Sequence, residues 1–158
     1  WVKMNTPSGG TAGVLAYRVI PAGRPQGKVA MKPKVLIVDD SRSMRQTLRL
    51  LLTPEFDCAM AESGPAALEH ARSHPPDIIV SDVTMEGMDG YELCRRVRAE
   101  PPLSEVPFLF LSGHAPRPDA PESAHPYLVK PVEPSLLLAR LHELVSSSAR
   151  VMRARTGS

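Results

Sequence analysis

The sequence has few of the residues that would stabilise a protein through disulfide bonds or hold it in a membrane. Only two of its 158 residues are cysteines, Cys58 and Cys94, and aromatic residues make up 4%. Two cysteines do not form a disulfide framework, so a reducing cytoplasm is the simpler interpretation. No run approaches the roughly 18 apolar residues of a transmembrane helix, so we expect no membrane contact.

The histidines are few, and none shows the spacing of metal ligands. We expect all five to be surface residues, namely His70, His74, His114, His125 and His142.

Acidic residues are absent from the first part of the chain. All 17 of them lie from Asp39 onward, whereas residues 1–38 hold six of the 19 basic residues, and the formal net charge is +2. A basic arm can contact nucleic acid or an acidic surface. An unstructured leader is the simpler interpretation, so we expect no nucleic-acid partner and assign the arm no function.

The composition predicts one domain with a flexible leader. Apolar residues make up 42% and charged residues 23%, which is ordinary for a globular protein. Residues 1–33 are rich in glycine and proline, which indicates a flexible leader, although residues 14–20 could form an extra strand. We place the domain at residues 34–148 and a basic tail at 149–158. Too little chain follows for a helix-turn-helix effector, which leaves open a stand-alone domain or a fragment of a longer protein.

Strand and helix patterns alternate along the domain. Five short apolar runs predict strands at residues 35–38, 58–61, 78–82, 108–111 and 127–129. Helical spacing or helix-start residues predict helices at residues 44–52, 65–73, 90–99 and 134–147. This alternation favours an α/β fold, a (βα)₅ doubly wound parallel sheet of the flavodoxin-like kind.

The region before the last predicted strand departs from this pattern. It contains four prolines, Pro116, Pro118, Pro121 and Pro126. Because proline removes a helical hydrogen-bond donor and clashes with the preceding turn, the fourth helix should be short, irregular or absent.

Polar residues follow four of the predicted strands. They are Asp39 and Asp40, Asp82, Ser112 and Lys130. Parallel strands of an open α/β sheet bind ligands at their carboxyl ends. Three carboxylates brought together there repel one another, so a bound cation is the natural compensation, and hard oxygen ligands suit Mg²⁺.

The same residues suit phosphoryl chemistry. A carboxylate can attack a phosphoryl group, and a metal ion offsets the negative charge of the phosphate. Lys130 would pair with a phosphate oxygen, and Ser112 would donate a hydrogen bond. Taken singly, Asp39 and Asp40 could form a helix-capping turn, Asp82 or Ser112 could begin a loop, and Lys130 could be a solvated charge. Their joint position at the strand ends favours a site.

With these motifs, residues 34–148 resemble the receiver domain of bacterial response regulators, such as the chemotaxis regulators. The matching motifs are Val35-Leu36-Ile37-Val38-Asp39-Asp40-Ser41, Asp82 followed by Met85, Asp89 and Gly90, Leu111-Ser112-Gly113, and Tyr127-Leu128-Val129-Lys130-Pro131.

The resemblance implies a role for each site residue. Asp82 would accept phosphate from a sensor histidine kinase. Asp40, Asp82 and the Thr84 backbone carbonyl would ligate Mg²⁺, with Asp39 acting through water. Ser112 would move toward the phosphate and Tyr127 would change rotamer. The phosphorylated domain would then act on a downstream protein target, as a cytoplasmic signalling module rather than an enzyme.

The chain differs from the family pattern in two places. Glu86 occupies the position after Met85 at which the family usually has proline. This difference should affect only the loop that contains it. The proline-rich segment 115–126 replaces a helix that belongs to the common output face of the family. We therefore hypothesise that signalling uses another surface, and the oligomeric state stays open.

Two other functions compete with a phosphorylated receiver. One is a receiver-like docking module that binds partners without phosphorylation. The proline-rich segment 115–126, which stands in place of the fourth helix, favours this alternative. The other is a flavodoxin-like cofactor binder or a phosphatase. Against it, the chain has no glycine-rich phosphate loop after the first strand, and the adjacent pair Asp39 and Asp40 is not the spaced aspartate pair of a phosphatase.

Overall fold

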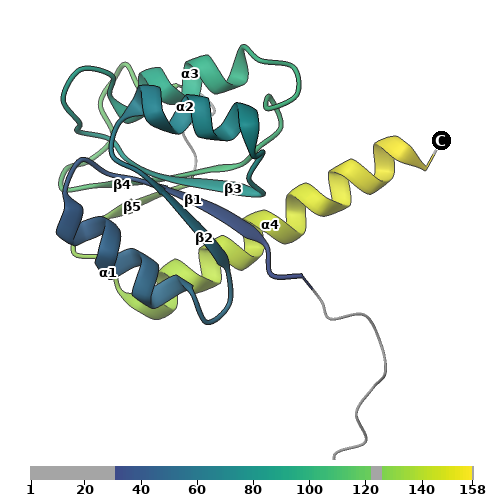
Figure 1. Cartoon of the computed structure of the whole chain (residues 1–158), viewed down its shortest axis with the longest axis horizontal. Helices are drawn as coiled ribbons and strands as arrows, with labels where there is room; N and C mark the ends of the chain where they lie inside the picture. Colours follow the sequence, from purple (N-terminus) through teal and green to yellow (C-terminus); the bar gives the residue numbers. More distant parts are fainter. Residues whose placement is uncertain (1–30, 122–125, 158) are drawn as a thin grey trace, which may run out of the picture. The chain divides into compact units, whose positions relative to one another are not determined.

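A five-stranded parallel sheet forms the centre of the computed structural model, which describes residues 31–121 and 126–157 (Figure 1). The strands are β1 (Lys34–Val38), β2 (Asp57–Ala61), β3 (Ile78–Asp82), β4 (Phe108–Ser112) and β5 (Tyr127–Val129). Their order in the sheet is β2-β1-β3-β4-β5, and every neighbouring pair is parallel. The predicted doubly wound sheet is confirmed.

Most of the predicted leader, with the possible strand at 14–20, lies outside the described residues. The leader and domain boundaries therefore stay predictions.

Four helices connect or follow the strands in the described residues. They are α1 (Arg42–Leu52), α2 (Gly64–Ser73), α3 (Gly90–Arg98) and α4 (Pro134–Thr156). Each begins after a capping residue whose side chain accepts a backbone N–H of the first turn, and these residues are Ser41, Ser63, Asp89 and Glu133. None of these helices combines the length and apolar character needed to cross a membrane.

The last helix is longer than the sequence indicated. We expected α4 to end near residue 147, where its core-facing apolar spacing ends. That expectation is wrong, because the helix continues to Thr156. Neither proline nor glycine occurs between Ser135 and Thr156, and the helix ends only at Gly157, whose N–H donates to the Arg153 carbonyl at 3.1 Å.

The two faces of the sheet are covered by different helix pairs. Figure 1 shows α2 and α3 over one face and α1 and α4 over the other. Side chains alternate between these faces along each strand, so Leu36 packs in the cluster toward α2 and α3, and Ile37 packs in the cluster toward α1 and α4. Both faces are apolar, which explains why the central strands read as unbroken apolar runs.

No helix forms between β4 and β5 in the described residues of that connection, as the prolines predicted. Arg117 instead fastens this connection to the start of α3. Its Nη2 atom lies 2.7 Å from Asp89 Oδ2, and its guanidinium lies 4.9 Å from the centre of the Tyr91 ring. Ala120 packs against the buried cluster beneath. A side-chain contact thus holds the segment that replaces a helix.

The contact of α4 with the sheet can be tested with two adjacent leucines. Leu137 is fully buried, whereas Leu136 is 45% exposed. We expect Leu137→Ala to lower the free energy of unfolding by about 2–5 kcal/mol, because it leaves a cavity under the helix. Leu136→Ala should change it by less than about 0.5 kcal/mol. Urea unfolding of both variants measures the difference, and equal losses would contradict this placement of the helix.

The Arg117 contact can be tested through Asp89. Burial alone would raise the pKa of Asp89, but the Glu92 backbone N–H and Arg117 outweigh it and hold the pKa below its usual value. The stability from this carboxylate is therefore present above about pH 4, the usual pKa of aspartate, and is lost as the pH falls through the lower native pKa.

We expect Asp89→Asn, which keeps a helix-capping side chain, to lower the free energy of unfolding at pH 7 by about 0.5–1.5 kcal/mol. The difference from the wild type should shrink toward pH 3. Thermal unfolding across this pH range measures it. Asp119→Asn, which removes the more exposed partner of Arg117, is the matched control and should cost less. A loss independent of pH would contradict the assignment.

Candidate functional site

The polar residues predicted to form a site meet at the carboxyl edge of the sheet. Asp39 directly follows β1, Asp82 ends β3, Ser112 ends β4 and Lys130 directly follows β5. Asp39, Asp82 and Ser112 are 2%, 8% and 3% exposed, whereas Asp40 is exposed. Three polar side chains of the predicted site are thus buried at the edge of the sheet, with one acidic side chain exposed at the rim.

Three carboxylates of this edge form a cluster with one ammonium group. One carboxylate oxygen from each of Asp39, Asp40 and Asp82 lies within 4.8 Å of the other two. Lys130 Nζ lies 3.2 Å from Asp39 Oδ2 and 3.1 Å from Asp82 Oδ1. Lys130 offsets one of three negative charges, so a divalent cation would balance the other two. We name these four residues the acidic pocket.

Burial controls the charge of Asp82. It raises the pKa of this carboxyl, and the neighbouring charges of Asp39 and Asp40 add to the effect, while the hydrogen bond and charge of Lys130 oppose it. The Asp82 carboxylate is therefore more basic than an exposed one, which makes it a better nucleophile.

Two opposing effects also act on the pKa of Lys130, and here burial is outweighed by the ion pairs. Burial alone would lower its pKa, but the ion pairs with Asp82 and Asp39 outweigh burial and raise it. Lys130 thus stays positively charged at neutral pH, beside the carboxylate that it neutralises in part.

Arg45 fixes the turn that presents the first two aspartates. Its Nη1 atom donates to the Asp39 carbonyl at 2.7 Å and to the Asp40 carbonyl at 3.1 Å. The Asp39 carboxylate in turn accepts the Ser41 N–H at 2.8 Å. The sequence did not indicate this role, because Arg45 looks like one of several basic residues on the polar side of α1.

Gly90 lets α3 approach the backbone of Asp82. A Cβ atom at Gly90 would lie 2.3 Å from the Asp82 carbonyl oxygen, which no side chain tolerates. The Gly90 N–H donates to the Val83 carbonyl at 2.9 Å. Thr84, two residues beyond Asp82, is exposed in the loop between them, and its role as a metal ligand stays a prediction.

Ser112 and Tyr127 are connected through the backbone of His114. Ser112 Oγ accepts the His114 N–H at 3.2 Å, and the Tyr127 hydroxyl donates to the His114 carbonyl. Lys130 N–H donates to the Ser112 carbonyl at 2.7 Å. The sequence placed Ser112 and Tyr127 on neighbouring strands but gave no sign that one residue joins them.

The comparisons with known proteins agree with this geometry. The family model described as the response regulator receiver domain matches residues 35–142. The response regulator PleD of Caulobacter vibrioides is 36% identical over 119 residues, which are 72% of this chain and 26% of PleD. The DNA-binding response regulator MtrA of Mycobacterium tuberculosis is 34% identical over 116 residues, which are 70% of this chain and 50% of MtrA. The chain thus spans about a quarter to a half of the length of these relatives.

A solved receiver-like structure matches this chain over almost the whole of that structure's own length. The chemotaxis protein CheY4 of Vibrio cholerae has 35% sequence identity and a TM-score of 0.66, and the match covers 73% of this chain and 99% of CheY4. The fold, the strand-end residues and the similarity to these proteins agree over one region. The chain therefore belongs to the family of response regulator receiver domains, the signalling modules of two-component systems.

Proposed function

We propose that this receiver domain is phosphorylated on Asp82, with Mg²⁺ in the acidic pocket, and that phosphorylation changes its binding to a downstream protein. The position of the Asp82 carboxylate among the charges of the acidic pocket is the main support for phosphorylation at this residue. Its buried carboxylate lies at a strand end, 3.1 Å from Lys130 and beside two further carboxylates. A structural salt bridge needs one acid and one base, so the two further acids favour a cation site.

The residues of the pocket divide the chemistry among them. One oxygen of Asp82 pairs with Lys130, which leaves the other to attack the phosphorus atom of a phosphohistidine. The new oxygen–phosphorus bond forms as the nitrogen–phosphorus bond breaks, and the leaving imidazole of the kinase takes up a proton. Lys130, freed from Asp82, then pairs with a phosphoryl oxygen.

The donor set fits magnesium. Asp40, Asp82 and the Thr84 carbonyl would hold the ion, with Asp39 acting through water, and all of these donors are the hard oxygens that Mg²⁺ prefers. When bound, the ion would offset the negative charge of the carboxylates and of the incoming phosphoryl group.

Ser112 and Tyr127 would convert the phosphoryl mark into a change of shape. Ser112 would turn its hydroxyl toward the phosphoryl group, which removes Oγ as the acceptor of the His114 N–H. Because the His114 carbonyl accepts the Tyr127 hydroxyl, a shift of His114 changes the hydrogen bond that holds the aromatic ring. The two states would then differ in contacts, as a population shift requires. The phosphoryl donor would be a sensor histidine kinase.

A docking module that works without phosphorylation is the second candidate. The segment between β4 and β5 favours it, because Arg117 holds this segment against α3 without any phosphoryl group. The presence of the complete acidic pocket favours the first function, since a docking module has no need of it.

Phosphorylation can be tested with a small phosphoryl donor. We expect acetyl phosphate and Mg²⁺ to increase the mass of the wild-type chain by one phosphoryl group, as measured by intact mass spectrometry. Asp82→Asn should show no increase, because the amide is not a nucleophile. Asp77→Asn changes an aspartate at the opposite end of β3 and should behave like the wild type. An unmodified wild-type chain would favour the docking module.

Metal binding can be tested separately by calorimetry. Asp40→Asn removes one charge from the acidic pocket, and we expect it to weaken Mg²⁺ binding by about tenfold or more, or about 1.4 kcal/mol. Glu143→Gln is the matched control, because Glu143 is an exposed acid that pairs with Arg140 on α4 at 2.9 Å, outside the cluster. Equal affinities in the wild type and Asp40→Asn would rule out Asp40 as a ligand.

A further inference from the structure

Two histidines lie together at the C-terminal end of α2, beside the first residues of β1 and β2 and thus at the edge of the sheet opposite the acidic pocket. The ring centres of His70 and His74 are 5.2 Å apart, and the ring planes are inclined by 27°. His74 N–H donates to the His70 carbonyl at 2.8 Å, so the last helical turn places both on one side of the helix. We expected no metal-ligand spacing among the histidines, but helical zinc sites use this four-residue separation.

The distance between the rings suits a shared metal ion. A zinc–nitrogen bond is about 2.0–2.1 Å long, which puts the centre of each bound imidazole roughly 3.2 Å from the ion. Two such rings at a tetrahedral angle have centres roughly 5 Å apart. The observed separation of 5.2 Å between the ring centres therefore matches that of two imidazoles bound to one ion.

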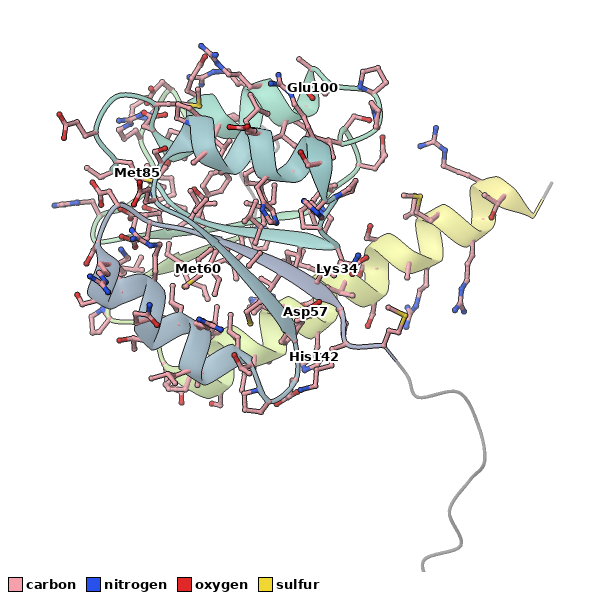
Figure 2. All side chains as sticks on the ribbon, viewed as in Figure 1. Lys34, Asp57, Met60, Met85, Glu100 and His142 are labelled. Carbon is pink, nitrogen blue, oxygen red and sulfur yellow. The ribbon has the colours of Figure 1, made fainter. Side chains whose placement is uncertain are left out.

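A carboxylate lies at the same hollow. Asp57, at the start of β2, lines a hollow of about 220 Å³ with His70 and His74. Ala59 and Ala61 contribute to the buried cluster under α2, so the alternation along β2 turns the Asp57 side chain toward the same helix. Figure 2 labels Asp57 on β2 at the amino end of the strand.

The charges around the hollow are mixed. The negative end of the α2 dipole favours a cation, and Glu69 lines a neighbouring hollow with both histidines. Arg72 is drawn away by its ion pair with Glu100 at 2.5 Å. Lys34 also lines the hollow, and its ammonium group opposes a second cation.

We propose that His70 and His74 bind a divalent transition-metal ion, for which Zn²⁺ is the natural probe, with Asp57 as third ligand. Two imidazoles and one carboxylate suit Zn²⁺, Cu²⁺ or Ni²⁺ rather than Mg²⁺. In the described residues, only the acidic pocket has three such donors already within 4.8 Å of one another. The Asp57 side chain therefore rotates toward the imidazoles when the ion binds. The bound ion ties the edge strand β2 to α2.

Calorimetric titration of the full chain with Zn²⁺, in a large excess of Mg²⁺ to occupy the acidic pocket, tests the proposal. We expect one Zn²⁺ per chain. His70→Asn and His74→Asn should each weaken binding about tenfold or more, and Asp57→Asn should weaken it by a smaller factor. His142→Asn is the matched control, because this exposed histidine pairs with Glu55 on another surface, and it should leave binding unchanged.

A second variant separates metal binding from structural damage. Lys34→Gln removes the opposing positive charge and should strengthen Zn²⁺ binding, which no loss of structure would do. The absence of Zn²⁺ binding in excess Mg²⁺ would overturn the proposal. So would Zn²⁺ binding that persists unchanged in His70→Asn and His74→Asn. Neither outcome bears on phosphorylation of Asp82, which is measured without Zn²⁺.

Discussion

The repulsion among three carboxylates at the end of the sheet is the constraint around which this domain is built. Asp39 and Asp82 are almost completely buried, and burial of unpaired charges is costly. Lys130 lies within 3.2 Å of both and offsets part of that cost. Because Lys130 follows β5 while the aspartates follow or end β1 and β3, the parallel arrangement of three strands is needed to bring the charges together.

This constraint also explains the polar contacts that surround the pocket. Arg45 holds the carbonyls of Asp39 and Asp40, so the two side chains are presented by a fixed turn. Gly90 allows α3 to pack on the Asp82 backbone without a clash. The main chain that presents the aspartates is thus set before any ion or phosphate arrives.

The sheet and the residues at its edge could be predicted because its strands are short, mostly apolar runs, and four of them end at or are followed by a polar site residue. The carboxyl ends of parallel strands must share one edge, so Asp39, Asp82 and Lys130 could be placed together without coordinates. The contact of Arg117 with Tyr91 could not, because it joins a segment without periodicity to a helix 26 residues earlier in the chain, and neither residue type is distinctive there.

The end of α4 and the pairing of histidines escaped prediction for another reason. Apolar spacing indicates where a helix touches the core, not where it stops, and α4 continues without a buried side chain beyond Leu141. His70 and His74 are ordinary polar residues in the sequence until the helix brings their rings together.

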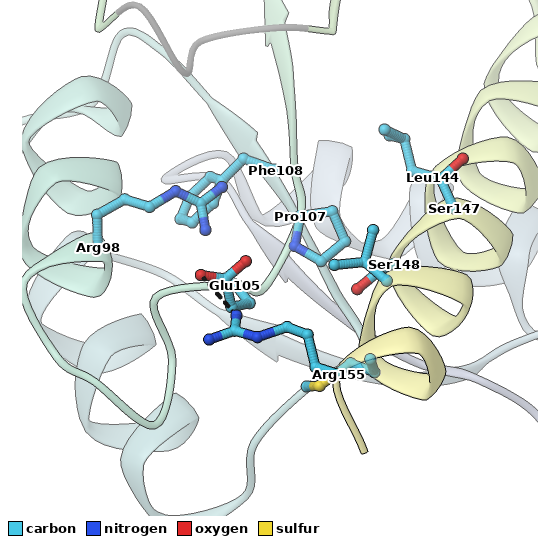
Figure 3. A pocket seen from close by; sticks show the side chains of 10 residues that line it. Arg98, Glu105, Pro107, Phe108, Leu144, Ser147, Ser148 and Arg155 are labelled. Carbon is cyan, nitrogen blue, oxygen red and sulfur yellow. Dashed lines mark ion pairs between the residues drawn. The ribbon is translucent and has the colours of Figure 1, made fainter. Parts of the chain in front are cut away.

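The free part of α4 leaves an open groove beside the sheet. Its walls come from the last turns of the helix, from Arg98 of α3 and from the segment at Glu105, Pro107 and Phe108. Arg155 reaches across the groove to Glu105 at 3.6 Å (Figure 3). Exposed ion pairs of this kind contribute little, so the last turns are held mainly by the stiffness of the helix itself.

That stiffness has a mechanical consequence. A helix of 23 residues is about 34 Å long, and α4 begins only four residues after Lys130. Because Leu137 and Leu141 are fully buried against the sheet, only the part of α4 beyond Leu141 can bend, and a bend of about 5° there would move the end of the helix, roughly 22 Å away, by about 2 Å. The last turns of α4 thus form a lever arm that is anchored at Leu141, and a small bend there is amplified at Thr156.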